Sequence, residues 1–483
     1  MLTVRTDPLN LLCVLLLSGL LAGASAGLAH AQSGMRSVEA VSTGGGTSAL
    51  DTGPSALYSN PANLTVGAGD HSLEIQLFRV GAYTGGDFHQ FDHIKSLFYQ
   101  EDGQSLSNQE EKAILDEWFG GEMRRANTYV EVVPLTFTYR PSGGAWAMGL
   151  GVRGRAFQAS AVNKGFFDAL LRGTGVDRVI PIDGRSRSYS TVDVTAAFSY
   201  RFPAPPLLVG VLPRSLLGPG FADATLVPRA MVQGDSLLHR FDYTARAAGP
   251  LSTGLFDTFN AFDDEPVPDL VGEGSFGIAG RGLGIDLGAT YTVRPNLHVS
   301  ASITDLGRIT WSKDAQTVTP ADNSFEFPGV ALDMDRLDDE FGGDVGDYVD
   351  HQVDSLAQEA YQDVERDRSS FTTSLPTTLH LSSTWGTGFA TLNGGVSVGL
   401  NEKAGAVPDP AAVHLGSTLH LGPIPIRLGV RAWGTQAVTA SGGFGLDFGF
   451  YRLDLGASVT PNTSTLGSGG RYAVSFSLAT IRF

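Results

Sequence analysis

The sequence predicts an all-β protein, a transmembrane antiparallel β-barrel of the outer-membrane type. Apolar and polar residues alternate over segments of about ten residues, the length that crosses a bilayer as a tilted strand. No apolar run after residue 31 approaches the length of a membrane helix, and short turns alternate with long connections. Fourteen strands are favoured and sixteen is the alternative, because single-chain bacterial barrels have even strand numbers. A soluble β-sandwich would also alternate, but it would seldom place large apolar residues so regularly opposite Gly, Thr and isolated charges.

Residues 1–31 have the pattern of a secretory signal peptide. Arg5 precedes an apolar run from Leu11 to Leu21, and Ala29-His30-Ala31 gives the small-x-small pattern of a cleavage site. The run is shorter than the ~20 residues that a membrane anchor needs. The only cysteine, Cys13, lies within it. We therefore expect export to the cell outer membrane and a mature chain that has no disulfide bonds.

The composition excludes several classes of function. The chain has 483 residues, 61 of them glycine, and a formal net charge of −17. An acidic chain with no basic patch is not expected to bind nucleic acid, because nothing would neutralise the phosphates. Much of the negative charge lies between Asp322 and Asp367, where 15 Asp or Glu face only two Arg. Their spacing lacks the pattern of a calcium loop, so a solvated surface loop is favoured and no metal site is predicted.

Residues 32–70 differ from the rest of the chain. They are rich in small and polar residues and show no strand alternation. Asn60-Pro61 indicates a turn or a helix entry. A flexible leader is the alternative, but a leader would not need Leu57 and Leu64 at this spacing. The candidate functional residues of the segment are Asp51, Pro54, Tyr58, Asn60, Pro61, Ala62 and Asn63.

Residues 71–483 carry the strand pattern, and one face of many strands is polar. Val192, Val194 and Phe198, for example, alternate with Asp193 and Arg201. We expect the apolar face to contact lipid and the polar face to line the lumen. The lumen-facing candidates are Asp193, Arg201, Asp286, Arg427, Arg431, Asp447, Arg452 and Asp454. They predict an interior of mixed charge.

The long connections are expected at about 84–126, 161–186, 247–275 and 307–370. Within the first, Ser107 and Glu110 form a capping box that predicts a helix to about Phe119. A second helix is predicted from Asp347 to about Arg366 by the 3.6-residue period of its apolar side chains.

The last strand ends on an aromatic residue. Tyr472, Val474, Phe476 and Leu478 alternate before Phe483. A terminal aromatic on an amphipathic strand resembles the signal that the barrel assembly machinery reads. An ordinary final strand is the alternative.

Catalytic motifs are not apparent. Gly149-Leu150-Gly151-Val152-Arg153-Gly154 formally matches a dinucleotide fingerprint, but it lies within a strand pattern and opens no helix. No HExxH, Gly-x-Ser-x-Gly or mature cysteine nucleophile is present. His414 and His420 share one strand face at a spacing that is too wide for one metal. We therefore expect no enzyme activity and no cofactor.

Four stretches resemble the long-chain fatty acid transporter (FadL-type) superfamily, or an uncharacterised bacterial outer-membrane family within or near it. They are Asp51 to Leu64 with its Asn-Pro-Ala turn, Leu106 to Leu115, Ala301 to Trp311 and Phe371 to Thr377. The resemblance implies a barrel at residues 71–483 with an N-terminal hatch, residues 32–70, folded into its lumen.

The resemblance also implies a passage or transport function for small molecules, hydrophobic ligands among them, with outer-membrane lipid as the surroundings. The mixed-charge lumen departs from an apolar tunnel. The alternative is a structural or accessory barrel that presents its long loops to partners.

Overall fold

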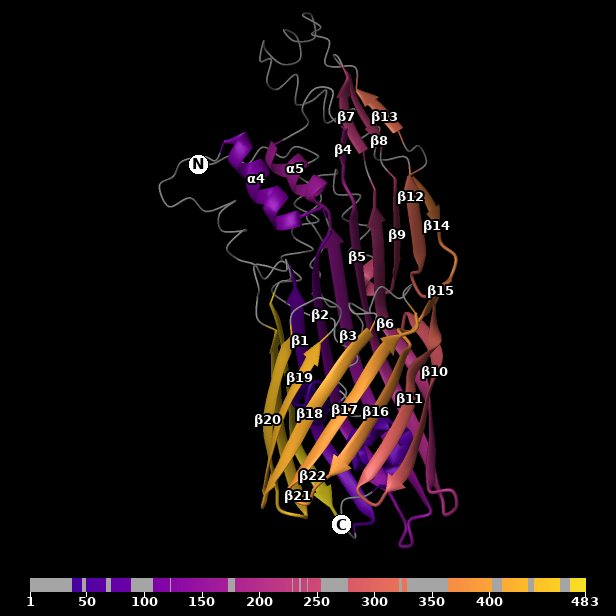
Figure 1. The fold of residues 1–483 in the computed structure, drawn as a ribbon. Helices are drawn as coiled ribbons and strands as arrows, with labels where there is room; N and C mark the ends of the chain where they lie inside the picture. Colours follow the sequence, from indigo (N-terminus) through magenta and orange to yellow (C-terminus); the bar gives the residue numbers. More distant parts are fainter. Residues whose placement is uncertain are drawn as a thin grey trace, which may run out of the picture.

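In the computed structural model the chain forms a closed β-barrel with further elements above one end (Figure 1). The structure describes the following residues: 37–45, 49–66, 71–87, 107–121, 123–172, 179–227, 229–233, 236–240, 242–252, 277–320, 324–327, 364–401, 411–432, 438–460 and 470–483. The predicted signal peptide, with Cys13, lies outside these residues.

Fourteen antiparallel strands close the barrel, which confirms the favoured count. Each strand pairs with the next in the order given, and the last pairs with the first. The strands are β1 (Leu73–Gly86), β2 (Arg124–Tyr139), β3 (Trp146–Val162), β5 (Gly184–Phe202), β6 (Leu207–Leu226), β10 (Gly280–Arg294), β11 (Leu297–Trp311), β16 (Thr378–Gly386), β17 (Ala390–Gly399), β18 (Ala411–Leu421), β19 (Ile424–Ala432), β20 (Thr439–Asp447), β21 (Tyr451–Thr460) and β22 (Arg471–Arg482).

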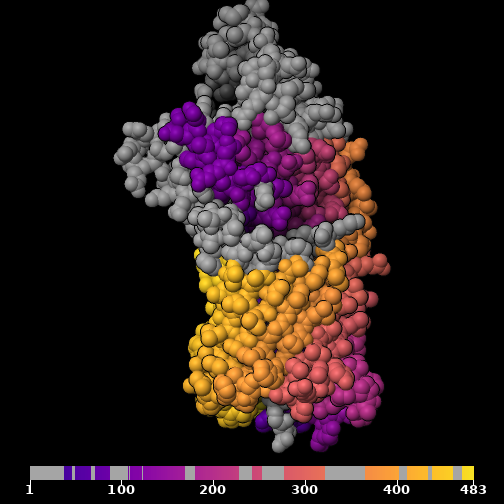
Figure 2. Space-filling model, in the orientation of Figure 1, coloured from indigo at the N-terminus to yellow at the C-terminus, as the bar shows by residue number. Residues whose placement is uncertain are grey.

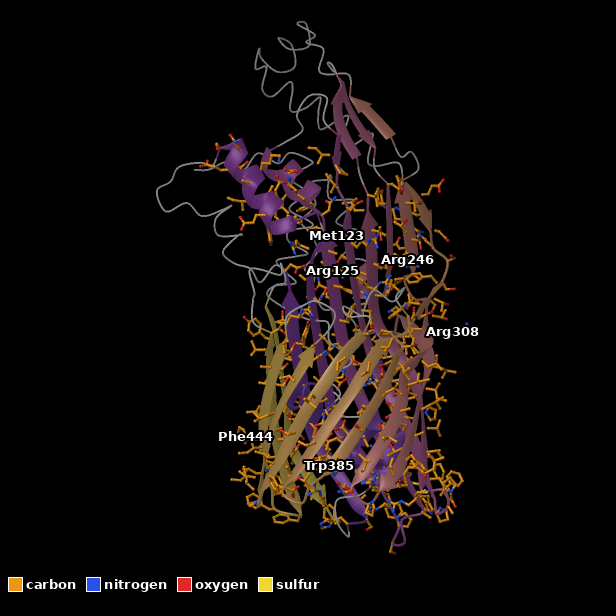
Figure 3. All side chains as sticks on the ribbon, in the orientation of Figure 1. Met123, Arg125, Arg246, Arg308, Trp385 and Phe444 are labelled. Atoms are coloured by element: carbon orange, nitrogen blue, oxygen red, sulfur yellow. The ribbon has the colours of Figure 1, made fainter. Side chains whose placement is uncertain are left out.

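The barrel has an apolar exterior because the strand period is two residues. On β5, Val194 and Phe198 are 48% and 49% exposed, whereas Asp193, next to Val194 on the other face, is fully buried. Trp385 and Phe444 point away from the wall in Figure 3. In the space-filling view the orange and yellow strands form a continuous wall (Figure 2). Such an exterior suits lipid, and the fold is that of an outer-membrane barrel.

The two ends of the barrel differ in their connections. Short turns join β2 to β3, β5 to β6, β10 to β11, β16 to β17, β18 to β19 and β20 to β21 at the end where the C-terminus lies (Figure 1). The Phe483 amide donates to the Leu73 carbonyl over 2.9 Å there, next to the β1–β22 seam. The long connections are all at the other end. In bacterial barrels the short turns face the periplasm, so we call this end periplasmic.

Strands also continue above the opposite end, on one side only (Figure 1). The long β6 pairs with β9 (Tyr243–Ala248), which pairs with β12 (Gln316–Pro320), which pairs with β14 (Val364–Asp367). β15 (Phe371–Ser374) pairs with the upper part of β11. A separate sheet contains β4 (Val179–Pro181), β7 (Arg229–Gln233), β8 (Ser236–Arg240) and β13 (Ser324–Phe327).

In the part of the connections that the structure describes, the helices α4 (Asn108–Phe119) and α5 (Lys164–Arg172) accompany these strands. The predicted capping box is present, since Glu110 N–H donates to the Ser107 hydroxyl and Ser107 N–H donates to the Glu110 carboxylate. Gly120 ends α4 in the left-handed region at φ 54°. Trp118 and Phe119 pack on Phe167, with ring centroids 5.2 and 5.6 Å apart, and so join the two helices.

Two sequence expectations need correction. The predicted helix 347–366 ends in a strand, because residues 364–367 form β14 and pair with β12; its other residues lie outside those described. The third long connection begins earlier than 247, since β6 ends at Leu226 and the chain next enters the barrel at Gly280. β7, β8 and β9 lie within this connection and are not among the fourteen strands that close the barrel.

Within the described residues before β1 there are three short helical elements. They are α2 (Val38–Ser42), η1 (Gly53–Tyr58) and η2 (Pro61–Thr65). Ser37 caps α2, and Asn60 caps η2 by accepting from the Ala62 amide over 3.1 Å. Pro54 and Pro61 stand at the first turns, where a missing N–H costs nothing. Among the described residues, no helix is long and apolar enough to cross a membrane.

Candidate functional site

The segment before β1 lies inside the barrel and reaches opposite walls. Its described parts, residues 37–45 and 49–66, are called the hatch segment from here on. α2 contacts β19 to β22, η1 contacts β1 to β3, and η2 contacts β3, β5, β6 and β10. Nearly all of these residues are buried. The segment therefore occupies much of the lumen.

The second half of the hatch segment is anchored by apolar packing. Leu57, Tyr58 and Leu64 form a buried cluster with residues of β2, β3, β5 and β6, among them Leu212. Polar bonds add to it, because the Ser199 hydroxyl donates to the Ala62 carbonyl over 2.8 Å. Removing such a segment would expose apolar surface to water, which costs a free energy of roughly 25 cal/mol per Å².

The predicted polar residues of this half hold it to the wall and to α2. Asn60 donates to the Thr290 hydroxyl over 3.0 Å, and that hydroxyl donates to Asn63 over 2.6 Å. Asn63 also donates to the Asp51 backbone carbonyl over 3.0 Å. The Asp51 carboxylate accepts from the Ser37 hydroxyl at 3.1 Å. Asp51 thus joins the N-cap of α2 to η2.

Glycines of the inward wall make room for the hatch segment. A Cβ on Gly151 would lie 2.4 Å from the Tyr58 hydroxyl, and one on Gly429 would lie 2.2 Å from the Thr43 carbonyl carbon. Contacts that short do not occur for real side chains, so the wall must lack side chains there. In the stretch that matches a dinucleotide fingerprint, Gly149 and Gly151 therefore leave space for the η1 side chains Leu57 and Tyr58.

The first half of the hatch segment is held mainly by polar contacts, together with Val41, which packs against Tyr83, Tyr129 and Phe157. Glu39 of α2 forms an ion pair with Arg452, and its carboxylate accepts from the Ser55 hydroxyl over 3.3 Å. Burial alone would raise the pKa of the Glu39 carboxyl, but Arg452, Arg427 and Arg79 outweigh it and lower the pKa to about 2. The carboxylate stays ionised at neutral pH.

A network of buried charges fills the lumen beside η1. It contains four arginines and four acids, so the formal charges cancel. The members are Arg79, Glu131, Arg153, Arg155, Asp193, Arg214, Asp286 and Asp305, from seven consecutive strands, β1 to β11.

Short contacts connect the members of this network. Arg79 lies 2.7 Å from Glu131, Arg153 lies 2.6 Å from Asp193, and Arg155 lies 2.7 Å from Asp305. Arg214 lies 2.8 Å from Asp305 and pairs with Asp286. Arg153 also lies over the Tyr58 ring, 4.5 Å from its centroid, which ties the network to the hatch segment.

Asp305 reaches the network through a β-bulge. The pairing of β10 and β11 shifts between Ile285 and Leu287, so that one extra residue stands on β11. Asp305 has φ 59° there, a conformation that Asp tolerates better than most residues. Its amide donates to Asp286 over 2.6 Å, and its carbonyl accepts from the Thr377 hydroxyl over 3.0 Å. The stretches 301–311 and 371–377 thus meet at this bulge.

The structure places the remaining predicted residues in a second group and at the periphery. Asp454 lies 2.7 Å from both Arg427 and Arg452. Asp447 pairs with Arg482 over 2.8 Å near the periplasmic turns. Arg201 is exposed at the turn end of β5 and donates to the Thr65 carbonyl over 2.9 Å, and Arg431 is buried on β19. Asp193 and Asp286 join the first network, whereas Asp454, Arg427 and Arg452 form a group with Glu39.

Several residues of these charged groups were not identified from the sequence. They include Glu39, Arg79, Glu131, Arg153, Arg155, Arg214, Asp305 and Arg482. Extending the alternation through β1, β2, β3 and β6 would have found most of them. Asp305 breaks the alternation because of the bulge, and no pattern identifies it.

The described residues gather no three side chains that could hold a metal ion. The Ser397 hydroxyl lies 2.8 Å from His414 Nε2. His414 Nδ1 lies 2.5 Å from the Gly44 carbonyl, not from a carboxylate. Since a carbonyl can only accept, Nδ1 carries the proton and Ser397 donates to Nε2. The contact lacks the acid of a hydrolase triad.

The chain matches a family described as "Family of unknown function (DUF5723)" over residues 70–406. It belongs to this family. The expected membership of an uncharacterised outer-membrane barrel family is thus confirmed, and the match covers the barrel from β1 to β17. A search of curated proteins found no match.

Solved structures that resemble the chain include two toluene transporters. TbuX from Ralstonia pickettii is 11% identical with a TM-score of 0.45, over 94% of this chain and 99% of that one. TodX from Pseudomonas putida is 12% identical with a TM-score of 0.43, over 92% and 97%. The translocator domain of NalP from Neisseria meningitidis is 9% identical with a TM-score of 0.34, over 86% and 90%. Since these scores are low, the fold is assigned from the strand pairing itself.

Proposed function

We propose that this protein is a passage barrel for small molecules in the outer membrane, and that α2 is the part of the hatch segment that moves. The observation that carries the proposal is the difference between the two halves of the segment. η1 and η2 place Leu57, Tyr58 and Leu64 in one buried apolar cluster. α2 places only Val41 in another such cluster, with Tyr83, Tyr129 and Phe157, and is otherwise held by an ion pair and by polar bonds over glycines.

Polar contacts can be exchanged for water when α2 leaves the wall, whereas η1 and η2 would lose buried apolar area. The neutral ion network fills the half of the lumen next to the anchored part. A path would therefore open beside β18 to β22, where α2 lies.

A disulfide can test whether α2 must move. A Cβ on Gly456 would lie 3.1 Å from the Ser42 Cβ and 2.8 Å from the Val38 carbonyl oxygen, so a small shift of α2 brings the pair to the ~3.8 Å of a disulfide. We expect the Ser42→Cys/Gly456→Cys variant to show almost no conductance in planar bilayers when oxidised and to recover it on reduction. The predicted mature chain has no other cysteine to interfere. Ser42→Cys alone is the control, and Gly456→Cys alone controls for the effect of the shift of α2.

Deletion of residues 37–45 removes α2 and is the opposite of locking it in place with a disulfide. We expect its conductance to be larger and permanent, with a folded barrel verified by the heat-dependent shift on gels. Equal conductance in the locked, reduced and deleted proteins would contradict the proposal.

The sheet above the barrel favours a second candidate function, the presentation of a surface to partners. β9, β12, β14 and the helices α4 and α5 are not needed to close the barrel, yet they are built as ordered elements. Co-purification of a partner that is lost when residues 87–123 and 312–370 are shortened would support this function. Co-purification that survives both changes would oppose it.

A further inference from the structure

The lumen wall that faces away from the ion network has a different chemistry. It consists of β16, β17, β18 and the part of β11 below the bulge, residues 297–304, and we call it the uncharged wall. Its buried residues are serine, threonine, histidine, asparagine and one glycine, with Ala390 and Ala412 as the only apolar ones. None of them is charged. The outward residues of the same strands, such as Leu415, are apolar and exposed.

Three hydroxyls of this wall are buried without a protein partner. Within the described part of the chain, Ser302, Thr384 and Thr418 make no hydrogen bond through their side chains. They come from β11, β16 and β18, so they are spread over the wall. Leaving a buried hydroxyl without a partner costs free energy. Each must therefore be satisfied by water or by a solute hydroxyl.

The hydrogen bonds that do exist on the uncharged wall are adaptable. The Ser300 and Ser382 hydroxyls lie 3.0 Å apart, and either can donate. A hydroxyl can rotate and thus serve as donor or acceptor to a passing group. Such a wall can exchange hydrogen bonds with a hydroxylated solute along its length.

The uncharged wall also meets the movable part of the hatch segment. His414 bonds to Ser397 on one side and to the Gly44 carbonyl on the other. Thr43 lies over Gly416 of the same strand. When α2 leaves, His414 Nδ1–H loses its carbonyl and becomes available to a solute. The wall would then be open beside the closed ion network.

We propose that the path takes small, uncharged, hydroxyl-rich solutes of the polyol class along the uncharged wall. The inference rests on the proposed passage function and names its substrate class. Hydrocarbons would find no apolar lining here. On this wall, ions and zwitterions would find no charged group to replace their hydration, and the charges of the ion network are already paired. Arg427 and Arg452 lie on β19 and β21, outside the uncharged wall.

Liposome swelling with the barrel lacking residues 37–45 tests the substrate class. We expect erythritol to enter several times faster than glycine, a zwitterion of smaller size. Thr384→Val/Thr418→Val should lower erythritol entry about fivefold and leave glycine entry unchanged, since the swap keeps the side-chain shape and removes two hydroxyls. Thr372→Val, on the exposed face of β15, is the matched control and should change neither rate.

Two results separate the possible failures. If glycine enters as fast as erythritol, or if the double valine variant slows both equally, the polyol proposal is wrong while the passage function stands. If no solute enters through the barrel without α2, although the gel shift shows a folded protein, the passage function itself is wrong.

Discussion

At the scale of single residues, Asp305 combines a backbone role and a charge role in the buried network. It combines a left-handed backbone, a β-bulge and contacts to Arg155 and Arg214 at 2.7 and 2.8 Å. Removal of one partner from a buried charge network costs roughly 3–5 kcal/mol, because the other charges stay buried without compensation.

We therefore expect Asp305→Asn to lower the free energy of unfolding by roughly 3 kcal/mol, since it removes the charge and keeps a side chain that tolerates φ 59°. Asp305→Ala should cost about 1 kcal/mol more, because alanine does not favour this backbone. Urea unfolding in detergent, followed by tryptophan fluorescence, measures both. Equal stability of Asp305→Asn and the parent would show that the network is not coupled to the bulge.

The ion pair of Glu39 predicts that the stability of the protein depends on pH. Its pKa is lowered from 4.5 to about 2, so the ion pair with Arg452 contributes stability above pH ~4.5 that is lost as the pH falls towards 2. The shift corresponds to roughly 3 kcal/mol. We expect Glu39→Gln to be less stable than the parent by about this amount at pH 7 and pH 5. The difference should shrink at pH 3, and a difference that is constant over this range would contradict the ion-pair assignment.

At the scale of elements, α2 depends on the absence of side chains beneath it. A Cβ on Gly429 would collide with Thr43, whereas one on Gly442 of the neighbouring strand would lie 3.8 Å from its nearest atom. Gly429→Ala should displace α2 and increase conductance several-fold, and Gly442→Ala should leave the conductance unchanged. Single-channel recording distinguishes the two. Unchanged conductance in both variants would mean that α2 can shift slightly and still stay on the barrel wall.

The elements also show what the sequence can and cannot predict. The strand alternation and the capping box at Ser107 are local signals, and both were confirmed because local chemistry decides them. Helix 347–366 was wrong in its last residues because strand pairing with β12 overrides an apolar period. The partners of Asp193 come from the two strands on either side of β5, β3 and β6, and only the pairing of these strands brings them together.

At the scale of the whole molecule, the barrel closes where β1 pairs with β22. Phe483 keeps its backbone bond to Leu73 while its ring is 62% exposed at the periplasmic end. We propose that the assembly machinery reads this ring. Phe483→Ala should therefore slow insertion into the membrane several-fold in a pulse-chase assay and leave the unfolding of the inserted barrel unchanged. An equal loss of insertion rate and stability would indicate a packing role instead.

The balance of the buried network has an electrical consequence. Four positive and four negative charges cancel in the ion network, and the uncharged wall carries none. The charged group beside α2 is different, because deletion of residues 37–45 removes Glu39 and leaves Arg427 and Arg452 with Asp454 alone. With a salt gradient across a bilayer, the barrel without residues 37–45 should therefore show a reversal potential shifted towards anion preference. Asp305→Asn would leave one more arginine in excess and should shift that potential further in the same direction.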